Sequence, residues 1–150
     1  MISADSLKQV LFLCTGNYYR SRFAEHLFNW LATKAELPWR AESRGLTGGH
    51  PNNIGPISRY ALEGLELRGV PIDSKPRYPV RVTLADLTRS DLVIAVKESE
   101  HRARLAEQFP LWAPLAEYWH VDDLDCADPE EALAVLDGNV RALVARLAVC

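Results

Sequence analysis

Short, continuous runs of apolar residues alternate along this chain with longer segments in which apolar residues recur at helical spacing. The runs at 10–14 and 92–96 are typical of strands that are buried on both faces of a sheet. Residues 39–46 and 116–121 are two further strand candidates. A stretch with helical periodicity follows each run, which is the order that right-handed β-α-β units require.

Several of the expected helices have recognisable ends. A helix is expected over 56–68, because Gly69 follows it where a C-cap glycine is typical. Thr83 has the residue type of a helix N-cap, and a polar helix is expected over 98–108. Residues 72–82 are rich in proline and basic residues and predict an irregular surface segment.

The last expected helix begins with Asp128 as cap, Pro129 at the first position and acidic residues in the first turn. It would bury the apolar residues that follow, which are Leu133, Leu136, Val140, Leu143, Val144 and Leu147. Strands that alternate with helices in this way predict an α/β fold, a three-layer α/β/α sandwich. No repeat or linker divides the chain, so residues 1–150 are expected to form a single domain.

Composition narrows the classes of partner. Of the 150 residues, 48% are hydrophobic and 25% are charged, as in ordinary soluble globular proteins. The net charge is −3, so no basic field spans the surface to attract nucleic acid or an anionic membrane, and neither is expected as a partner. No export signal is visible in the polar first residues, which makes the cytoplasm the expected location.

Three cysteines, Cys14, Cys126 and Cys150, are too few and too scattered for a disulfide framework. No pair of histidines has metal-ligand spacing, so no metal is expected. Cys14 differs from the other two because it ends the first predicted strand and opens a turn-rich segment.

The segment from Cys14 to Ser21 lies where open parallel sheets collect their ligands, at the carboxyl end of a strand. Gly16 and Asn17 tolerate left-handed backbone angles, so the loop can turn tightly and point its N–H groups inward around an anion. Arg20 offers a planar fork of donors for two phosphate oxygens. Ser21 stands at the start of the expected helix and can donate to the Cys14 sulfur.

These surroundings favour nucleophilic chemistry at Cys14. A thiol beside a guanidinium and a helix N-terminus ionises readily. The thiolate can attack phosphorus while the surrounding donors stabilise the equatorial oxygens. The expected phosphate-binding residues are Thr15, Gly16, Asn17, Tyr18, Tyr19, Arg20 and Ser21.

Residues 10–25, VLFLCTGNYYRSRFAE, are similar to the signature of the low-molecular-weight protein tyrosine phosphatase family, whose loop reads C-x-G-N-x-C-R-S before an Ala-Glu helix. Ser43 and Gly45 resemble part of the second strand of that family, and residues 91–94 resemble its third strand. The resemblance implies a four-stranded parallel sheet with a phosphatase P-loop after strand 1. It also implies a two-step reaction through a cysteinyl-phosphate, with no metal and no cofactor.

The same resemblance implies roles for individual residues. Cys14 would be the nucleophile, Arg20 would bind phosphate and Ser21 would tune the thiolate, while Asn17 and Ser43 would brace the loop. The implied substrate is a phosphorylated protein or a small phosphomonoester, with phosphotyrosine as the expected type. The protein is expected to be a monomer or a weak dimer.

Cleavage of a phosphate ester also needs an acid that protonates the leaving oxygen. The family supplies an aspartate after its fourth strand, in an Asp-Pro pair. Aligning residues 118–119 with the end of that strand places Asp123 in the position of the acid, with Asp125 as the second candidate. Asp128 matches the Asp-Pro dipeptide, but its place before the last helix favours a capping role.

The chain also departs from the family pattern. Tyr19 replaces the second loop cysteine, so protection of Cys14 by that disulfide is excluded, and Cys126 is left either as a substitute partner or as an unreactive small residue. Tyr18 would flank the pocket in place of the aromatic residues that the family carries elsewhere. The basic residues within 75–81 either attract an acidic partner or form a solvated strip.

Two other functions remain open. An arsenate reductase on the same fold would bind arsenate as a phosphate mimic, but the thioredoxin-linked reaction needs two further cysteines, and Cys126 and Cys150 lie far from the usual relay positions. A phosphate- or phosphoprotein-binding module with weak catalysis would bind phosphate without forming a cysteinyl-phosphate.

Overall fold

The structure, a computed structural model, describes residues 7–149 of the chain. Its strands form a four-stranded sheet in the order β2-β1-β3-β4, and all neighbouring strands are parallel. The strands are β1 (Lys8–Cys14), β2 (Trp39–Gly45), β3 (Leu92–Ala95) and β4 (Glu117–Tyr118). The parallel α/β sheet predicted from the apolar runs is confirmed.

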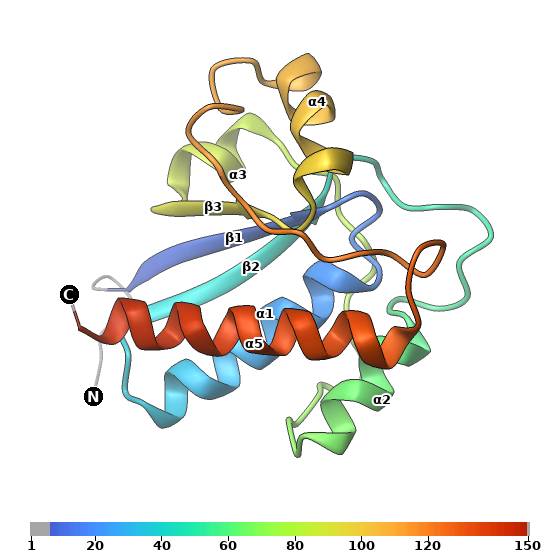
Figure 1. Ribbon diagram of the computed structural model, residues 1–150, viewed down its shortest axis with the longest axis vertical. Helices are drawn as coiled ribbons and strands as arrows, with labels where there is room; N and C mark the ends of the chain where they lie inside the picture. The colour runs from blue at the N-terminus through green and yellow to red at the C-terminus, as the bar shows by residue number, and fades with distance from the viewer. Residues whose placement is uncertain (1–6, 150) are drawn as a thin grey trace.

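Helices cover both faces of this sheet. One face carries α1 (Arg20–Lys34), α2 (Arg59–Leu67) and α5 (Pro129–Ala148), and the other carries α3 (Leu84–Arg89) and α4 (Glu98–Gln108) (Figure 1). The expected three-layer α/β/α sandwich is therefore confirmed.

Strand β1 is apolar on both sides because each side faces a different core. Val10 and Phe12 pack with α1, α2 and α5, whereas Leu11 and Leu13 pack with α3 and α4. Successive side chains of a strand point to opposite faces, so the part of β1 that is covered on both sides, residues 10–14, has no polar position. The same alternation places Cys14 on the side of α1.

The helices begin where the sequence supplies capping groups. Thr83 and Asp86 exchange hydrogen bonds between side chain and backbone and so form a capping box at α3. Helix α2 begins later than expected because the hydroxyl of Ser58 caps it, accepting from the N–H of Tyr60 at 3.2 Å. Gly69 follows α2 with φ +74, as its place in the sequence predicts.

Three details differ from the expected elements. Strand β4 is only two residues long, and it is an edge strand that pairs with β3 alone. Asp128 is the N-cap residue of α5, but its side chain makes no capping hydrogen bond. Val144 and Leu147 pack against the core while remaining partly exposed, so the far end of α5 is less enclosed than its apolar spacing predicts.

Parallel pairing brings several loops to one edge of the sheet. Cys14 is paired with Gly45, and Ala95 is paired with both Leu13 and Tyr118. The loops that leave these four strand ends therefore start side by side. They carry most of the residues that the sequence marks as functional.

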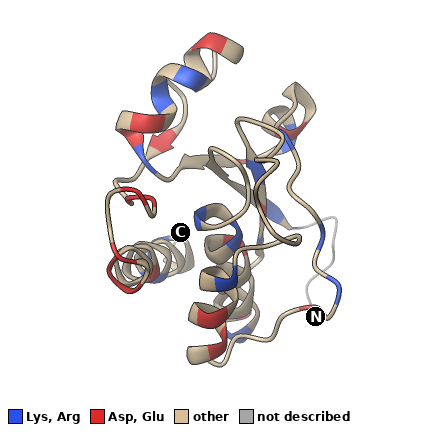
Figure 2. Ribbon diagram, turned by 90° about the vertical axis from the view of Figure 1, so that its right-hand side faces the viewer, with Lys and Arg blue, Asp and Glu red and all other residues tan. Residues whose placement is uncertain are grey.

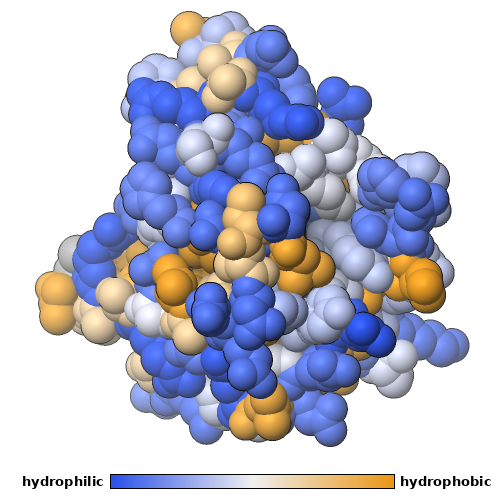
Figure 3. Space-filling model, turned by 45° about the vertical axis from the view of Figure 1, so that its right-hand side comes forward, coloured by the Kyte–Doolittle hydropathy of each residue, from blue (hydrophilic) through white to orange (hydrophobic). Residues whose placement is uncertain are grey.

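The surface seen in Figure 3 is mostly hydrophilic, with apolar side chains in separate patches. Ile54 and Leu124, on two of the loops that leave the functional edge, are exposed. Among residues 7–149, no helix has the length and apolar character needed to cross a membrane.

Candidate active site

The cradle loop, residues 14–21, turns tightly between β1 and α1. Asn17 has φ +53, a left-handed conformation that asparagine tolerates better than most residues. At Gly45 a Cβ would lie 2.6 Å from the carbonyl oxygen of Thr47 and 2.9 Å from that of Thr15. Only glycine therefore lets the two backbones approach, and the N–H of Thr47 then donates to Thr15 at 2.8 Å.

Cys14 and Ser21 meet inside this loop. The Cys14 Sγ lies 2.9 Å from the Ser21 Oγ, and both residues are buried. The side-chain amide of Asn17 donates to the same Ser21 oxygen at 2.8 Å. Because that oxygen accepts from Asn17, its own proton is free to point at sulfur, and we assign Ser21 as the donor. Such a hydroxyl can hold a thiolate through a charge-assisted hydrogen bond.

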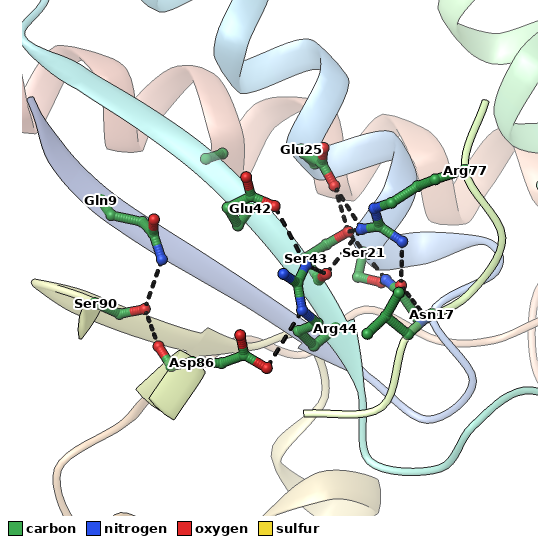
Figure 4. A network of polar contacts seen from close by, with 12 residues as sticks. Gln9, Asn17, Ser21, Glu25, Glu42, Ser43, Arg44, Arg77, Asp86 and Ser90 are labelled. Atoms are coloured by element: carbon green, nitrogen blue, oxygen red, sulfur yellow. Dashed lines mark hydrogen bonds and ion pairs between the residues drawn. The ribbon is translucent and has the colours of Figure 1, made fainter. Parts of the chain in front are cut away.

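Arg77 supports the loop from a segment far along the chain (Figure 4). Its guanidinium donates to the Asn17 Oδ1 at 2.8 Å and to the carbonyl and hydroxyl oxygens of Ser43 at 2.8 and 3.0 Å. It also lies 3.2 Å from Glu25, while Asn17 donates to the Ser43 hydroxyl at 2.9 Å. The interpretation of residues 75–81 as a partner-attracting or solvated strip is wrong for Arg77, because its charge is turned inward.

Arg20 is held by three groups at the start of α1. Its Nη2 lies 2.7 Å from the Glu100 Oε2 and 3.3 Å from the Asp123 Oδ2. Its Nη1 donates to the carbonyl oxygen of Val121 at 2.9 Å. The side chain is only 2% exposed, so these contacts fix the orientation of its donor fork.

Glu100 links Arg20 to the cradle loop. Its carboxylate accepts from the hydroxyl of Thr15 and lies 2.9 Å from the His101 Nε2. Burial opposes the ionisation of Glu100, but hydrogen bonds from His101, Arg20 and Thr15 outweigh it and hold the pKa well below its usual range. Glu100 therefore stays negative and balances the charge of Arg20.

His101 is fully buried, and its two ring nitrogens have different partners. The Nδ1 accepts from the backbone N–H of Lys97 at 3.1 Å, so we assign the proton to Nε2, which donates to Glu100. Burial lowers the pKa of His101, and the contact with Glu100 opposes that shift without reversing it. The ring is therefore a neutral spacer that fixes the Glu100 carboxylate.

A cavity of about 560 Å³, the Cys14 cavity, opens over the cradle loop. Residues of the loop that line it are Cys14, Thr15, Gly16, Tyr18, Tyr19 and Arg20. Residues from the neighbouring loops and from α4 complete it, namely Thr47, Gly49, His50, Asn53, Arg104, Asp123, Leu124 and Asp125. Asn17 and Ser21 are buried behind this lining.

The three aspartates considered as the general acid lie in two different places. Acidic residues gather on the chain that leads into α5, as the red segments of Figure 2 show. Asp123 and Asp125 line the Cys14 cavity, whereas Asp128 lines a different cavity of about 400 Å³ between α2 and α5. Asp123 also lies within ion-pair distance of Arg20. The first candidate of the sequence analysis is thus the one in contact with the cradle loop.

The two tyrosines of the loop point to different neighbours. The Tyr18 hydroxyl donates to the carbonyl oxygen of Ile54 at 2.6 Å, which places the ring along the cavity wall. The Tyr19 hydroxyl donates to the carbonyl oxygen of Pro129 at 3.4 Å. Burial raises the pKa of Tyr19 to about 12, and the charge of Asp123 adds to that shift. Tyr19 therefore stays protonated and ties the loop to α5.

The sequence analysis did not assign three charged residues to the site: Arg77, Glu100 and Arg104. Glu100 and Arg104 belong to the helix that follows a buried strand, and this position at the functional edge was a usable signal. Arg77 lies in an irregular segment, where no periodicity indicates which side chain turns inward.

Cys14 and Cys126 both carry free thiols, and Cys150 lies outside the described residues. Over residues 7–149, no group of three or more His, Cys, Asp or Glu side chains is placed to hold a metal ion.

The sequence model of the family "Low molecular weight phosphotyrosine protein phosphatase" matches residues 9–147. The chain belongs to this family. A low molecular weight phosphotyrosine protein phosphatase from Pongo abelii is 29% identical over 103 residues. That alignment covers 67% of this chain and 62% of the length of the relative. The family resemblance that the loop motif predicted is confirmed.

Solved structures agree on the low molecular weight phosphatase fold. A low molecular weight protein tyrosine phosphatase from T. tengcongensis has a TM-score of 0.76 and 28% identity, with 93% of this chain and 99% of that chain covered. A thioredoxin-dependent arsenate reductase from Corynebacterium glutamicum has a TM-score of 0.70 and 25% identity, with 98% of this chain and 65% of that chain covered.

Proposed function

We propose that this chain hydrolyses phosphomonoesters through a covalent cysteinyl-phosphate intermediate. One observation carries the proposal: the Cys14 sulfur, 2.9 Å from the Ser21 hydroxyl, shares a cavity with Arg20. A nucleophile, a donor that can hold its thiolate and a cation for phosphate thus converge within one loop. Membership of a phosphatase family supports the same reaction.

The reaction would take two steps. In the first, the Cys14 thiolate attacks phosphorus, the bond from phosphorus to the leaving oxygen breaks, and an aspartic acid protonates that oxygen. Arg20 and the loop N–H groups stabilise the charge on the equatorial oxygens. In the second, water attacks phosphorus, the aspartate takes its proton, and the sulfur–phosphorus bond breaks to release inorganic phosphate and the thiolate.

Asp123 is the proposed acid, and Asp125 is the alternative. Both line the Cys14 cavity, and Asp123 is supported further by its place 3.3 Å from the Arg20 Nη2. A substrate phosphate bound by Arg20 would bring its leaving oxygen toward this carboxyl. Asp128 is not proposed, because it lines the cavity between α2 and α5.

The proposed substrate is a phosphorylated protein or a small phosphomonoester, with phosphotyrosine as the preferred type. The family name supports that preference. So does the Tyr18 ring, which lines the cavity and offers an aromatic surface to a substrate ring.

Hydrolysis of p-nitrophenyl phosphate and phenyl phosphate across pH tests the proposal. Cys14→Ser should lose at least about 10³-fold in kcat on both esters, because the nucleophile is gone. Asp123→Asn should lose about 10²–10⁴-fold on phenyl phosphate. It should lose less on p-nitrophenyl phosphate, whose leaving group departs without a proton. Asp125→Asn is the matched control and should stay close to wild type.

Each of the other outcomes has a clear meaning. Turnover that survives in Cys14→Ser would contradict the covalent mechanism. Loss in Asp125→Asn with Asp123→Asn intact would reassign the acid. If the wild-type protein is inactive but phosphate still protects Cys14 from alkylation, the result would support a phosphate-binding module instead.

Arsenate reduction is the second candidate, favoured by the structural similarity to the Corynebacterium glutamicum enzyme. It requires cysteines that relay a disulfide from the nucleophile to thioredoxin. Arsenite formation that depends on thioredoxin, and that is lost in Cys126→Ser, would support it. Phosphatase activity with no arsenite formed would rule it out.

A further inference from the structure

Lys97 stands between the end of β3 and the start of α4, beside the loop that carries Asp123. Its backbone forms an antiparallel bridge with His120. Next to this bridge, the N–H of Val121 donates to the carbonyl oxygen of Val96 at 2.8 Å. The backbone of Lys97 is therefore fixed at the point where the chain leaves β4.

The side chain of Lys97 contacts both ends of the acid loop, residues 122–126. Its Nζ lies 2.9 Å from the Asp122 Oδ1 and 3.8 Å from the Cys126 Sγ. The Lys97 side chain is 18% exposed and that of Asp122 is 48% exposed, so the lysine is the more enclosed partner. An enclosed cation on a fixed backbone is a suitable anchor for a loop.

Within the acid loop the backbone is folded on itself, and Asp123 reaches the cradle loop. The N–H groups of Cys126 and Ala127 donate to the Asp123 carbonyl oxygen at 3.0 and 3.1 Å. The Asp123 carboxylate lies 3.3 Å from Arg20. Two cations therefore hold the acid loop, Arg20 through Asp123 and Lys97 through Asp122.

These two ion pairs differ in the reacting state. An acid that is about to donate its proton is a neutral carboxyl, and a neutral carboxyl forms no ion pair with a guanidinium. A substrate phosphate also takes over the donors of Arg20. When Asp123 acts as the acid, the ion pair between Lys97 and Asp122 is therefore the one that persists.

We propose that Lys97 is a positioning residue, which holds the acid loop over the Cys14 cavity while Asp123 transfers its proton. The inference rests on the proposed function, because it assigns a role only if Asp123 is the acid. Lys97 acts through Asp122 and touches none of the reacting atoms. Loss of Lys97 should lower kcat, since a displacement of about 1 Å in a catalytic group can lower a rate by about 10²-fold.

The test compares Lys97→Met with Lys97→Arg on the same two esters. Lys97→Met should lower kcat for phenyl phosphate by about tenfold or more, with a smaller loss on p-nitrophenyl phosphate and little change in KM. Lys97→Arg keeps the charge and should recover most of the loss. Arg102→Met is the matched control, because Arg102 lies on α4, which begins just after Lys97, and pairs with Glu98, 2.9 Å away, outside the acid loop.

A double variant separates positioning from a general loss of structure. In the Asp123→Asn background there is no acid to position, so adding Lys97→Met should change phenyl phosphate turnover by less than about twofold. Equal losses on both esters, no loss on either, or a full loss in the Asp123→Asn background would overturn the role of Lys97 and leave the phosphatase standing. A wild type without Cys14-dependent turnover would overturn both proposals.

Discussion

Asn17 links the hydrogen bonds around Cys14 and Ser21 to those around Ser43 and Arg77, behind the cradle loop. Its amide nitrogen donates to Ser21 and Ser43 at 2.8 and 2.9 Å. Its amide oxygen accepts from Arg77 at 2.8 Å and from the backbone N–H of Val80 at 3.1 Å. These contacts use both donors and both lone pairs of the amide. The residue with the left-handed backbone is thus also the one whose side chain connects the nucleophile to its supports.

Arg77→Ala tests this support at the scale of one residue. The variant removes the donors to Asn17 and Ser43 while the Val80 contact remains. We expect kcat/KM for p-nitrophenyl phosphate to fall by about 10- to 100-fold, because the loop loses its fixed geometry. Arg81→Ala is the control from the same segment, since Arg81 is exposed and its guanidinium donates to the side-chain oxygen of Gln108 at 3.4 Å. Equal losses in the two variants would contradict a specific role for Arg77.

At the level of helices and strands, the first turns of α1 pack against both α2 and α5. Gly64 of α2 makes this possible, because a Cβ there would lie 2.5 Å from the Leu133 Cδ1 and 3.2 Å from the Phe23 Cε2. Phe23 and Leu133 are both buried, and a Cβ at Gly64 would force at least one of the two side chains to shift. Phe23 follows Arg20 in the first turns of α1, so this packing also fixes the helix that carries the phosphate-binding arginine.

Gly64→Ala and Gly138→Ala form a matched pair of helix substitutions. Alanine is favoured over glycine in a helix by about 1 kcal/mol, so Gly138→Ala, where a Cβ meets nothing within 4 Å, should raise the free energy of unfolding. At Gly64, overpacking of about 1–3 kcal/mol opposes that gain and should leave the protein less stable. Thermal unfolding followed by circular dichroism measures both, with about 2–4 °C expected per kcal/mol. A stabilised Gly64→Ala would show that α2 can move away without cost.

For the molecule as a whole, the sequence predicted the features that are written in one continuous segment. It missed the contacts between segments that only the fold brings together. Buried parallel strands leave continuous apolar runs, so the sheet and its two helix layers could be predicted. The cradle loop could be found because Cys14, Arg20 and Ser21 lie in one segment. Arg77 and Glu100 reach that loop from distant segments, and no local period marks the side chains that turn toward it.

His26, on α1, is one of two enclosed histidines that couple the stability of the molecule to pH. Burial lowers its pKa from the ordinary value of 6.5. The Glu25 carboxylate opposes the shift, while Arg22 and Arg77 add to it. The folded protein therefore resists protonation of His26.

His101, on α4, lies on the opposite side of the sheet and behaves in the same way. Burial lowers its pKa from 6.5, the hydrogen bond to Glu100 opposes the shift, and Arg20 and Arg104 add to it. Protonation would also break the contact in which its Nδ1 accepts from the Lys97 N–H.

The free energy of unfolding should therefore fall as the pH drops below about 6.5. Above that pH both rings are neutral in the folded and unfolded chains, so they add no pH dependence. Below it the unfolded chain binds protons that the folded chain does not bind. Each histidine can then steepen the fall in the free energy of unfolding by up to about 1.4 kcal/mol per pH unit.

Urea unfolding from about pH 5 to about pH 7.5 measures the slope of the free energy of unfolding against pH. His26→Gln and His101→Gln should each flatten it, whatever they do to stability at the upper end of that range. An unaltered slope in both buried variants would mean that the folded protein accommodates the charged rings.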